Sequence, residues 1–425
     1  MNLVVLGLWH LGCVTAACCA EHFSVTGLDF DDALIENLRD AKAPLFEPGL
    51  DDLLRAGLDV NRLRFTTDPA DPALCAADVL WVCYDTPVDE NDVADVPYVL
   101  DRLARCLPAL RPGATVLISS QIPAGTCRAL ENEYPGIAFA CSPENLRLGK
   151  ALDIFRHPER IVVGTRTPET RATLTPLFAP FCDDILWMRS ESAEMTKHGI
   201  NAWLALSVTF ANEIARLCEA VGADAREVER GLRSEPRIGQ KAYIRPGAAF
   251  AGGTLARDVV ALTRLAKESG DPAALFPAIL AGNDAHKDWA LTRLRTLLDP
   301  FPGATVAVLG LTYKPGTDTL RRSGAVELAA KLLAAGVTVR CYDPVVTTLP
   351  PELAAATLCP TLDAALADAD AAVVATEWPQ IKAGDWPTLV PRMRRGVIVD
   401  ANGFLNLRPD QIPGVKYFAV GTPEN

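Results

Sequence analysis

Two glycines and one acidic residue near the N-terminus have the types and spacing of a dinucleotide-binding site. Gly7 and Gly12 bracket a turn that follows the apolar run 2–6, and Asp29 ends a second apolar run. The amides at the start of a helix after such a turn suit a pyrophosphate, and an acid after the second strand bonds a ribose diol. Because the same acid repels a 2′-phosphate, the pattern predicts NAD as the cofactor and disfavours NADP.

The glycine turn departs from the usual fingerprint at its second glycine, which is Trp9 in this chain. That glycine normally lets the backbone approach the pyrophosphate, so a side chain there either collides with the cofactor or moves the turn onto another path. Trp9 packing outward with His10 facing the phosphates is one possible path of the turn. A separate alternative is that Asp29 only caps a strand and does not bond a ribose. The residues that the pattern assigns to cofactor binding are Gly7, Trp9, His10, Leu11, Gly12 and Asp29.

A strand, a turn, a helix and a second strand must hold these residues, and this order is how a parallel doubly wound sheet begins. Further short apolar runs predict strands at 79–83, 115–119 and 160–163. A long helix is predicted from Ser192 to Val221, followed by a helical block that ends near Trp289. The turn-rich stretch DPFPG at 299–303 then reads as a linker.

After the linker the opening pattern recurs, with an apolar strand and a glycine at 304–315 and a strand ending in an acid at 337–344. The repeat predicts an α/β fold with two doubly wound Rossmann-like domains joined by a helical central domain with a long helix. A chain of 425 residues is also too long for one core. The predicted domains are 1–190, 191–298 and 299–425.

The composition is typical of soluble globular proteins of the cytoplasm. A net charge of −12 and a pI near 5.0 argue against a nucleic-acid partner. The twelve cysteines form no CxxC pair and no zinc-type cluster with histidine, so we expect reduced, buried thiols and no metal site. No segment is apolar enough to span a bilayer, and the apolar N-terminus lacks the basic region of a signal peptide, so no membrane association is expected.

Several segments, in order along the chain, resemble motifs of one family. APLFEPGLDDLL (43–54) is similar to SPIYEPGLEELL, DTPVDENDVADVPYV (85–99) to a TP-containing loop ending in ADLSYV, and SPENLRLGKALDIFRHPERIVVG (142–164) to a segment with PEFLREG. EMTKHGINAWLALSVTFANE (194–213) is similar to ELxKxxxNxxLAxxISFxNE, FAGGTLARD (250–258) to GFGGSCFPKD, and GLTYKPGTDTLRRS (310–323), with TEW at 376–378 behind it, to GLAFKPxTDDxRxS. The chain therefore resembles the UDP-glucose/GDP-mannose dehydrogenase family, a family of nucleotide-sugar dehydrogenases, over almost its whole length.

The resemblance implies an enzyme that uses NAD to oxidise the carbon-6 alcohol of a nucleotide-linked sugar to a carboxylate in two hydride transfers. It also implies that the first domain holds NAD, that the last holds the nucleotide, and that the sugar lies between them. The long central helix is expected to form a homodimer, which makes 191–298 the dimerisation domain.

Residues in register with the family's site take their roles from the resemblance. Lys197 and Asn201 stand at the positions of its electrostatic and water-holding groups, four residues apart on one helical face. Asp258 matches its base-assisting aspartate and Glu144 the first glutamate of PEFLREG. Oxidation of an alcohol needs a base for its proton and a positive group for the alkoxide, so these residues fit the first oxidation. Further implied cofactor contacts are Thr86, Pro87, Gln121 and Arg257, and further implied substrate contacts, beside Glu144, Lys197 and Asn201, are Leu146, Arg237, Tyr243, Phe250, Gly253, Tyr313, Lys314 and Arg321.

The family's catalytic cysteine is Thr254 in this chain. In the family that thiol attacks the aldehyde, the thiohemiacetal is oxidised to a thioester, and water releases the acid. A threonine hydroxyl is far less acidic than a thiol and is a poor substitute. The glutamate associated with thioester hydrolysis is Leu148, the threonine near the catalytic water is Gln121, and the loop lysine is Arg257. These differences from the family concern residues of the second oxidation, whereas the residues implied for the first oxidation are largely retained.

Three functions stay open at this point. The first is a nucleotide-sugar oxidoreductase limited to two-electron chemistry between alcohol and aldehyde. The second is a redox-neutral epimerase with retained NAD, because an aldehyde at carbon 6 acidifies the hydrogen on carbon 5. The third is a non-catalytic nucleotide-sugar-binding protein, for which Trp9 in the phosphate turn is the best support.

Overall fold

A computed structural model describes residues 1–425 except 90, 91, 145, 252, 409, 424 and 425. Three of the segments quoted above thus contain positions outside the described residues, namely Glu90 with Asn91, Asn145, and Gly252. The chain forms two compact units, Met1–Ile200 and Asn201–Asn425. Helix α9, Ser190–Val221, runs through the boundary between them, and the predicted three-domain division stays a prediction. None of the helices in the described part of the chain has the length and apolar character needed to cross a membrane.

The first unit contains an eight-stranded sheet with the order β3-β2-β1-β4-β5-β6-β7-β8. Neighbouring strands are parallel except β6 and β7, which are antiparallel. The order reverses between β1 and β4, the switch point at which doubly wound sheets bind ligands. The strands are β1 (Asn2–Leu6), β2 (Ser24–Leu28), β3 (Leu63–Thr66), β4 (Val79–Val82), β5 (Thr115–Ile118), β6 (Ala138–Cys141), β7 (Ile161–Gly164) and β8 (Ile185–Met188), and the helices are α1 (His10–Ala20), α2 (Asp32–Arg39), α3 (Leu50–Asp59), α4 (Pro72–Ala76), α5 (Val96–Cys106), η1 (Leu107–Ala109), α6 (Thr126–Glu133), α7 (Ala151–Arg156) and α8 (Pro168–Phe178).

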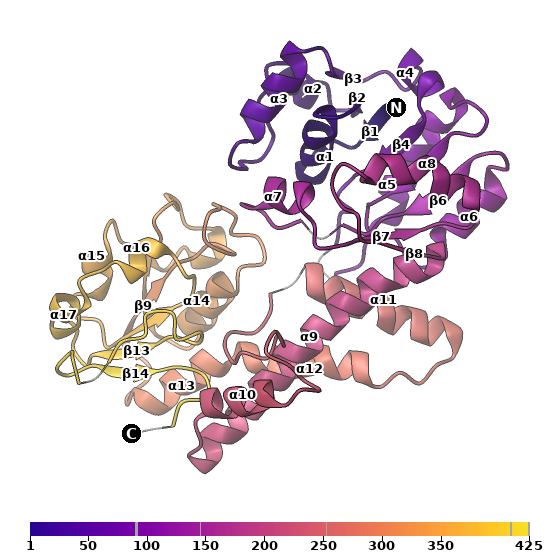
Figure 1. The fold of residues 1–425 in the computed structure, drawn as a ribbon. Coiled ribbons are helices and arrows are strands. Elements are labelled where there is room, and N and C mark those ends of the chain that lie inside the picture. The colour runs from indigo at the N-terminus through magenta and orange to yellow at the C-terminus, as the bar shows by residue number, and fades with distance from the viewer. Residues whose placement is uncertain (90–91, 145, 252, 409, 424–425) are drawn as a thin grey trace. The chain divides into compact units, whose positions relative to one another are not determined.

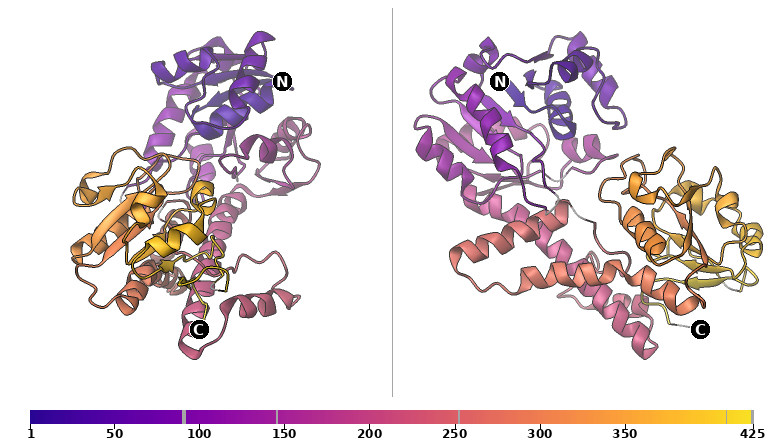
Figure 2. Two further views of the ribbon diagram at one scale, coloured as in Figure 1. Left: turned by 90° about the vertical axis from the view of Figure 1, so that its left-hand side faces the viewer. Right: turned by 180° about the vertical axis from the view of Figure 1, so that it is seen from behind.

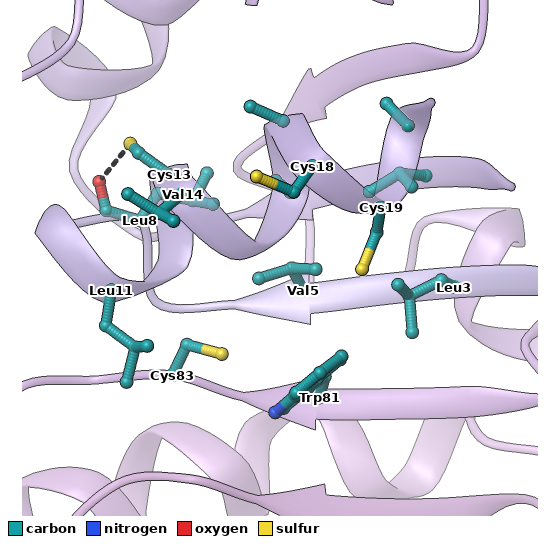
Figure 3. Close-up of a cluster of buried hydrophobic side chains, with 14 of the residues drawn as sticks. Leu3, Val5, Leu8, Leu11, Cys13, Val14, Cys18, Cys19, Trp81 and Cys83 are labelled. Carbon is teal, nitrogen blue, oxygen red and sulfur yellow. Dashed lines mark hydrogen bonds between the residues drawn. The ribbon is translucent and has the colours of Figure 1, made fainter. Parts of the chain in front are cut away.

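Helices cover both faces of this sheet (Figure 1), and β1 packs against both layers. Leu3 and Val5 belong to the core cluster that contains α1, whereas Val4 and Leu6 belong to the cluster on the other face. Figure 3 shows Cys13, Val14, Cys18 and Cys19 of α1 over the strand that carries Leu3 and Val5. Every residue of α1 after His10 is buried, and most are small, so the helix lies close against the sheet. The apolar N-terminal run is therefore the centre of a core.

The second unit contains a helical part and a six-stranded parallel sheet with the order β11-β10-β9-β12-β13-β14. Residues of α9, α11 and α12 form one apolar cluster in the helical part, and these helices can be followed in Figures 1 and 2. The helices are α10 (Ala225–Ser234), α11 (Thr254–Ser269), α12 (Leu275–Lys287), α13 (Trp289–Leu297), α14 (Gly324–Ala334), η2 (Pro351–Leu353), α15 (Leu362–Leu366), α16 (Pro379–Lys382), α17 (Trp386–Leu389) and η3 (Val390–Arg392), and the strands are β9 (Thr305–Leu309), β10 (Thr338–Tyr342), β11 (Thr357–Leu358), β12 (Ala371–Val374), β13 (Val397–Val399) and β14 (Lys416–Phe418).

Two doubly wound sheets and a long helix confirm the predicted fold class. The expected end of the helical block near Trp289 is wrong, because Trp289 begins a further helix, α13, which continues to Leu297. Trp289, Leu291 and Leu294 are buried in the core cluster of the second sheet, so packing extends the helical part past the position where the sequence pattern weakens.

Candidate active site

The cofactor turn adopts a conformation that requires glycine at two positions. Gly7 has a φ of +93°, and a Cβ there would lie 2.6 Å from Cγ of Tyr84. A Cβ on Gly12 would collide with the carbonyl oxygen of Gly7. Both positions therefore exclude a side chain, in agreement with the fingerprint.

Trp9, which replaces the second glycine, stands at the N-cap of α1 in an extended conformation. Its side chain is 47% exposed, so of the arrangements predicted for Trp9 the outward one is observed. The side chain does not cap the helix, and the first turn of α1 carries no acid. These features leave the helix start suited to an anion. Contact between this turn and NAD stays a prediction.

Asp29 is a buried carboxylate that holds the turn in place. Its Oδ2 accepts a hydrogen bond from the Leu8 amide at 2.7 Å, and its Oδ1 accepts from the amides of Phe30 at 2.7 Å and Asp31 at 3.3 Å. Burial raises the pKa of Asp29, and the amide bonds counteract that shift. Asp29 is therefore a structural part of the turn, and its predicted bond to a ribose would be an addition to this role.

The second sheet repeats this arrangement around Asp343, a residue to which the sequence reasoning assigned no site. Its Oδ2 accepts from the amides of Leu311 at 2.7 Å and Thr312 at 3.2 Å, beside Gly310, which has a φ of +86°. In addition, the indole of Trp378 donates to the same oxygen at 3.1 Å. The recurring pattern of a strand ending in an acid was the available signal for this residue.

Asp29→Asn tests the cofactor role of this carboxylate, with Asp343→Asn as the matched control. The new asparagine faces backbone amides either with its NH2 group, which cannot accept their hydrogen bonds, or with its neutral oxygen, which is a weaker acceptor than a carboxylate. Each change should therefore lower the free energy of unfolding by about 1–3 kcal/mol. Only Asp29→Asn is expected to weaken NAD binding, at least about tenfold, as measured by calorimetry. Equal losses of NAD affinity in the two variants would show that Asp29 acts on stability alone.

His10 is engaged by a buried carboxylate that sequence reasoning missed. Its Nε2 lies 3.0 Å from Oε2 of Glu47, which also accepts hydrogen bonds from the amides of Gly149 at 2.7 Å and Ala151 at 2.9 Å. Glu47 therefore ties the start of α1 to the segment that follows Leu148. Its signal in the sequence was an acid inside the FEPG turn.

The first turns of α9 hold the loops that follow β5 and β6. Glu194 is buried and accepts hydrogen bonds from the amides of Gly125 at 2.5 Å and Cys127 at 2.9 Å. One turn later, Nζ of Lys197 donates to the carbonyl of Glu144 at 2.6 Å. The structure thus brings together Lys197 and Glu144, two of the predicted site residues. Glu194, which positions the loop that carries Gln121, was not predicted.

Two further hydrogen-bonded contacts lie in this part of the first unit. His198 is buried, and its Nε2 lies 3.2 Å from the carbonyl oxygen of Ile122. The hydroxyl of Thr86 donates to the carbonyl of Gln121 at 2.7 Å. The predicted cofactor residues Thr86 and Gln121 are therefore adjacent.

In the second unit, the buried side chains of Asn201 and Asp258 form a close pair. Nδ2 of Asn201 donates to Oδ2 of Asp258 at 2.5 Å. This bond fixes the amide of Asn201, so its Oδ1 is directed as an acceptor. An acceptor amide held in this way can fix the direction of a water or a hydroxyl.

Thr254 is the first residue of α11, after Gly253 with a φ of +107°. A helix N-terminus lowers the pKa of a cysteine thiol and so favours a thiolate nucleophile at this position. The same field leaves a threonine hydroxyl protonated near neutral pH, because its pKa lies far higher. The start of α11 would therefore favour a thiolate, but the residue there is a threonine whose hydroxyl stays protonated.

The cysteines of the second unit, Cys218, Cys341 and Cys359, are buried, and burial raises the pKa of each. All twelve cysteines are free, and ten are buried; the expectation of buried thiols is wrong for Cys75, which is exposed, and for Cys182, which is partly buried. Within the described residues, no group of three or more His, Cys, Asp or Glu side chains is placed to hold a metal ion.

A pocket of about 390 Å³ lies within the second unit and collects several predicted substrate residues. Phe250, Tyr313 and Lys314 line it together with Arg322, whereas Arg237 and Tyr243 do not. The guanidinium of Arg237 is exposed and pairs with Glu235 at 2.7 Å. The start of α14 and the cationic side chains of Lys287, Lys314, Arg322 and Lys331 at one pocket suit a phosphate-bearing ligand.

His286, which also lines the pocket, is buried between a carbonyl and an arginine. Its Nε2 lies 2.8 Å from the carbonyl oxygen of Gly247, and its Nδ1 lies 3.0 Å from a guanidinium nitrogen of Arg216. Burial lowers the pKa of His286 from 6.5 to about 4. The ring is therefore neutral, with Nδ1 accepting from Arg216 and Nε2–H donating to Gly247.

This histidine should make stability depend on pH. Its folded-state pKa is the lower one, so its contribution is full above about pH 6.5 and is lost as the pH falls toward 4. Between about pH 7.5 and about pH 5 the expected loss is about 2 kcal/mol. Urea unfolding at both pH values is the measurement. Between these pH values the free energy of unfolding of His286→Gln should fall by about 2 kcal/mol less than that of the wild type. An unchanged pH dependence would contradict the burial of a neutral ring.

Two doubly wound domains, one with a dinucleotide turn and one beside a phosphate-suited pocket, define a dehydrogenase with a second nucleotide-binding domain. The chain belongs to the UDP-glucose/GDP-mannose dehydrogenase family. Residues 1–182 match the family's NAD binding domain, residues 191–285 its central domain and residues 307–407 its UDP binding domain. The chain is accordingly an NAD-dependent dehydrogenase.

Relatives match the chain end to end. It is 35% identical to a UDP-glucose 6-dehydrogenase of Pseudomonas aeruginosa, with 100% of this chain and 98% of the relative covered. A UDP-glucose 6-dehydrogenase of Rhizobium meliloti is 33% identical, with 100% of both chains covered. The solved structure of a UDP-glucose dehydrogenase from Pyrobaculum islandicum superposes with a TM-score of 0.86 at 30% identity, covering 99% of this chain and 97% of the other.

Proposed function

We propose that the chain oxidises the carbon-6 alcohol of a UDP-linked sugar to the aldehyde with NAD and stops at this two-electron stage. The observation that carries the proposal is Thr254 at the start of α11, where the family's reaction needs a thiolate. The UDP binding domain and the relatives named UDP-glucose 6-dehydrogenase support the choice of substrate class.

The residues for the first oxidation are present on α9 and α11. When bound, the nicotinamide of NAD takes the hydride from carbon 6. The ammonium of Lys197 stabilises the alkoxide, because a positive charge on a helix is preorganised for it. Asn201, held by Asp258, orients a water through its Oδ1, and the carboxylate of Asp258 takes the proton of the alcohol through that water.

For the second oxidation, the chain lacks the nucleophile and the water-activating carboxylate that the resemblance calls for. An aldehyde becomes a hydride donor after a nucleophile or water has added to it, and Thr254 is not ionised near neutral pH. Leu148 stands where a carboxylate would activate water for thioester hydrolysis. The aldehyde is therefore the expected product.

The test is the stoichiometry of NADH with UDP-glucose and related UDP-sugars, with the product trapped by an aldehyde reagent. A single NADH per sugar and a trapped aldehyde are expected. Two NADH and a uronic acid would overturn the limit at two electrons. Solvent deuterium in recovered sugar without net NADH would favour the epimerase, and no binding of NAD by calorimetry would favour the binding protein.

We also infer a homodimer formed through α9 and a location in the cytoplasm. Large apolar side chains recur on α9 every seven residues at Trp203, Phe210 and Leu217, and Val221 follows at the helix end. These side chains are exposed, Trp203 by 67% and Val221 by 79%. A stripe at this spacing is buried when a second helix packs along it. The reduced thiols support the cytoplasm.

Replacing the stripe with charge should dissociate the dimer. The wild-type chain, of 45.6 kDa, is expected to sediment at twice that mass. Trp203→Glu combined with Phe210→Glu should sediment as a monomer, because a buried unpaired carboxylate costs several kcal/mol. Leu275→Glu, an exposed position on α12, is the control and should stay dimeric. A monomeric wild type would overturn the inference.

A further inference from the structure

The segment 247–250, which leads into the Thr254 loop, is held by side chains rather than by helix or sheet bonds. Asn212 of α9 accepts a hydrogen bond from the Gly247 amide at 2.9 Å and donates to the Ala248 carbonyl at 3.4 Å. His286 of α12 bonds the Gly247 carbonyl at 2.8 Å. Asn402, after β13, accepts from the Ala248 amide at 2.7 Å.

Asn283 of α12 binds the backbone of Phe250, at the C-terminal end of this segment, with both the oxygen and the nitrogen of its side-chain amide. Its Oδ1 accepts from the Phe250 amide at 2.9 Å, and its Nδ2 donates to the Phe250 carbonyl at 2.9 Å. The side chain therefore replaces the partner that a neighbouring strand would offer. Asn283 is 3% exposed, so little water competes for these bonds.

The held segment lies between the pocket and the start of α11. Ala248 and Phe250 line the pocket, and His286 lines it as well. Gly253 and Thr254 follow within four residues of Phe250, and the first turn of α11 carries Asp258. A Cβ on Gly247 would collide with Oδ1 of Asn402, which shows how closely the segment is enclosed.

We propose that Asn283 and His286 are positioning residues, which hold 247–250 so that the start of α11 presents Thr254 and the Asn201–Asp258 pair in one fixed arrangement. The proposal rests on the proposed oxidation at that site. Small displacements of reacting groups cost large factors in rate. A rigid support of buried, fully bonded side chains prevents such displacements.

The chemistry of the two side chains predicts which substitutions fail. In Asn283→Asp, an acceptor oxygen replaces Nδ2 and faces the Phe250 carbonyl, while the bond to the Phe250 amide is kept. In His286→Leu, the Gly247 carbonyl and the Arg216 guanidinium both lose a buried partner. In His286→Gln, one amide group again offers an acceptor and a donor, so this variant should rescue the loss.

The experiment measures kcat and KM for the UDP-sugar, UDP affinity by calorimetry, and deuterium uptake of the peptide that covers 245–255. Trp386→Phe is the control, because it removes a different buried hydrogen bond of the second unit, to the carbonyl of Ile381 at 3.1 Å. Asn283→Asp and His286→Leu should lower kcat about tenfold to hundredfold and raise deuterium uptake in this peptide, with KM and UDP affinity within about threefold. His286→Gln should restore kcat.

A kcat unchanged by Asn283→Asp, or lowered equally by Trp386→Phe, would overturn the positioning role. If the wild type forms no NADH with any UDP-sugar, the proposed oxidation fails by itself. Deuterium uptake then still decides the inference, because uptake unchanged by both Asn283→Asp and His286→Leu would overturn the hold on 247–250.

Discussion

Lys197→Ala is expected to lower kcat for alcohol oxidation by about a thousandfold while KM for the UDP-sugar changes by less than about tenfold. The ammonium of Lys197 interacts most strongly with the substrate when the hydroxyl becomes an alkoxide. Removing the ammonium therefore destabilises the transition state more than the ground state. Lys197 reaches the Glu144 carbonyl at 2.6 Å, which fixes the direction of its side chain. Steady-state formation of NADH is the measurement.

Lys267→Ala is the matched control, because Lys267 is an exposed lysine in the last turn of α11. It should leave kcat within about twofold of the wild type. Lys197→Arg keeps the charge with another shape and should recover only part of the rate. A loss of less than about tenfold in Lys197→Ala would remove Lys197 from the catalytic role, provided that thermal unfolding shows an intact fold.

Thr254→Cys is expected to change the product. At the start of α11 the thiol should ionise readily, attack the aldehyde and form a thiohemiacetal, and a second hydride transfer to NAD would then leave a thioester. Formation of NADH should rise from a single equivalent per sugar toward a second one. The acyl-enzyme should accumulate and be seen as an added mass, because the resemblance places the carboxylate for its hydrolysis at position 148, which is Leu in this chain.

Two further variants separate the parts of this result. Thr254→Ser keeps a hydroxyl and should still yield aldehyde alone. Thr254→Cys with Leu148→Glu should release the uronic acid and turn over. If Thr254→Cys neither forms an adduct nor yields a second NADH, then Gln121 and the rest of the site, and not the nucleophile alone, prevent the acyl-enzyme half of the reaction.

The predictable parts of the fold are those with strong local patterns. Strand β1, α1 and β2 were predicted because an apolar run, a glycine turn and a second apolar run leave few alternatives. The strands near 79, 115 and 160 and the long helix α9 were also predicted, as was the second sheet, which repeats the first pattern. The end of the helical block was missed, because α13 is held by core packing and not by its own periodicity.

For the candidate site, the sequence supplied expected positions, whose roles stay predictions, but no bonds between them. Lys197, Asn201 and Asp258 came from register with the family, yet nothing in their spacing indicated that Asn201 and Asp258 pair at 2.5 Å. Glu47, Glu194 and His286 carry no motif of their own. Each acts on a backbone group distant in sequence, and such a partner exists only once the chain is folded.

By itself the sequence determined that this chain is a dehydrogenase with two nucleotide-binding domains, because glycines and strand-end acids act through their chemical type. The tertiary structure alone decided that Trp9 points outward, that Asp29 supports the turn, and that buried amides hold the segment before Thr254. Those properties depend on directions and distances between groups far apart in the chain, and the pattern of residue types does not contain them.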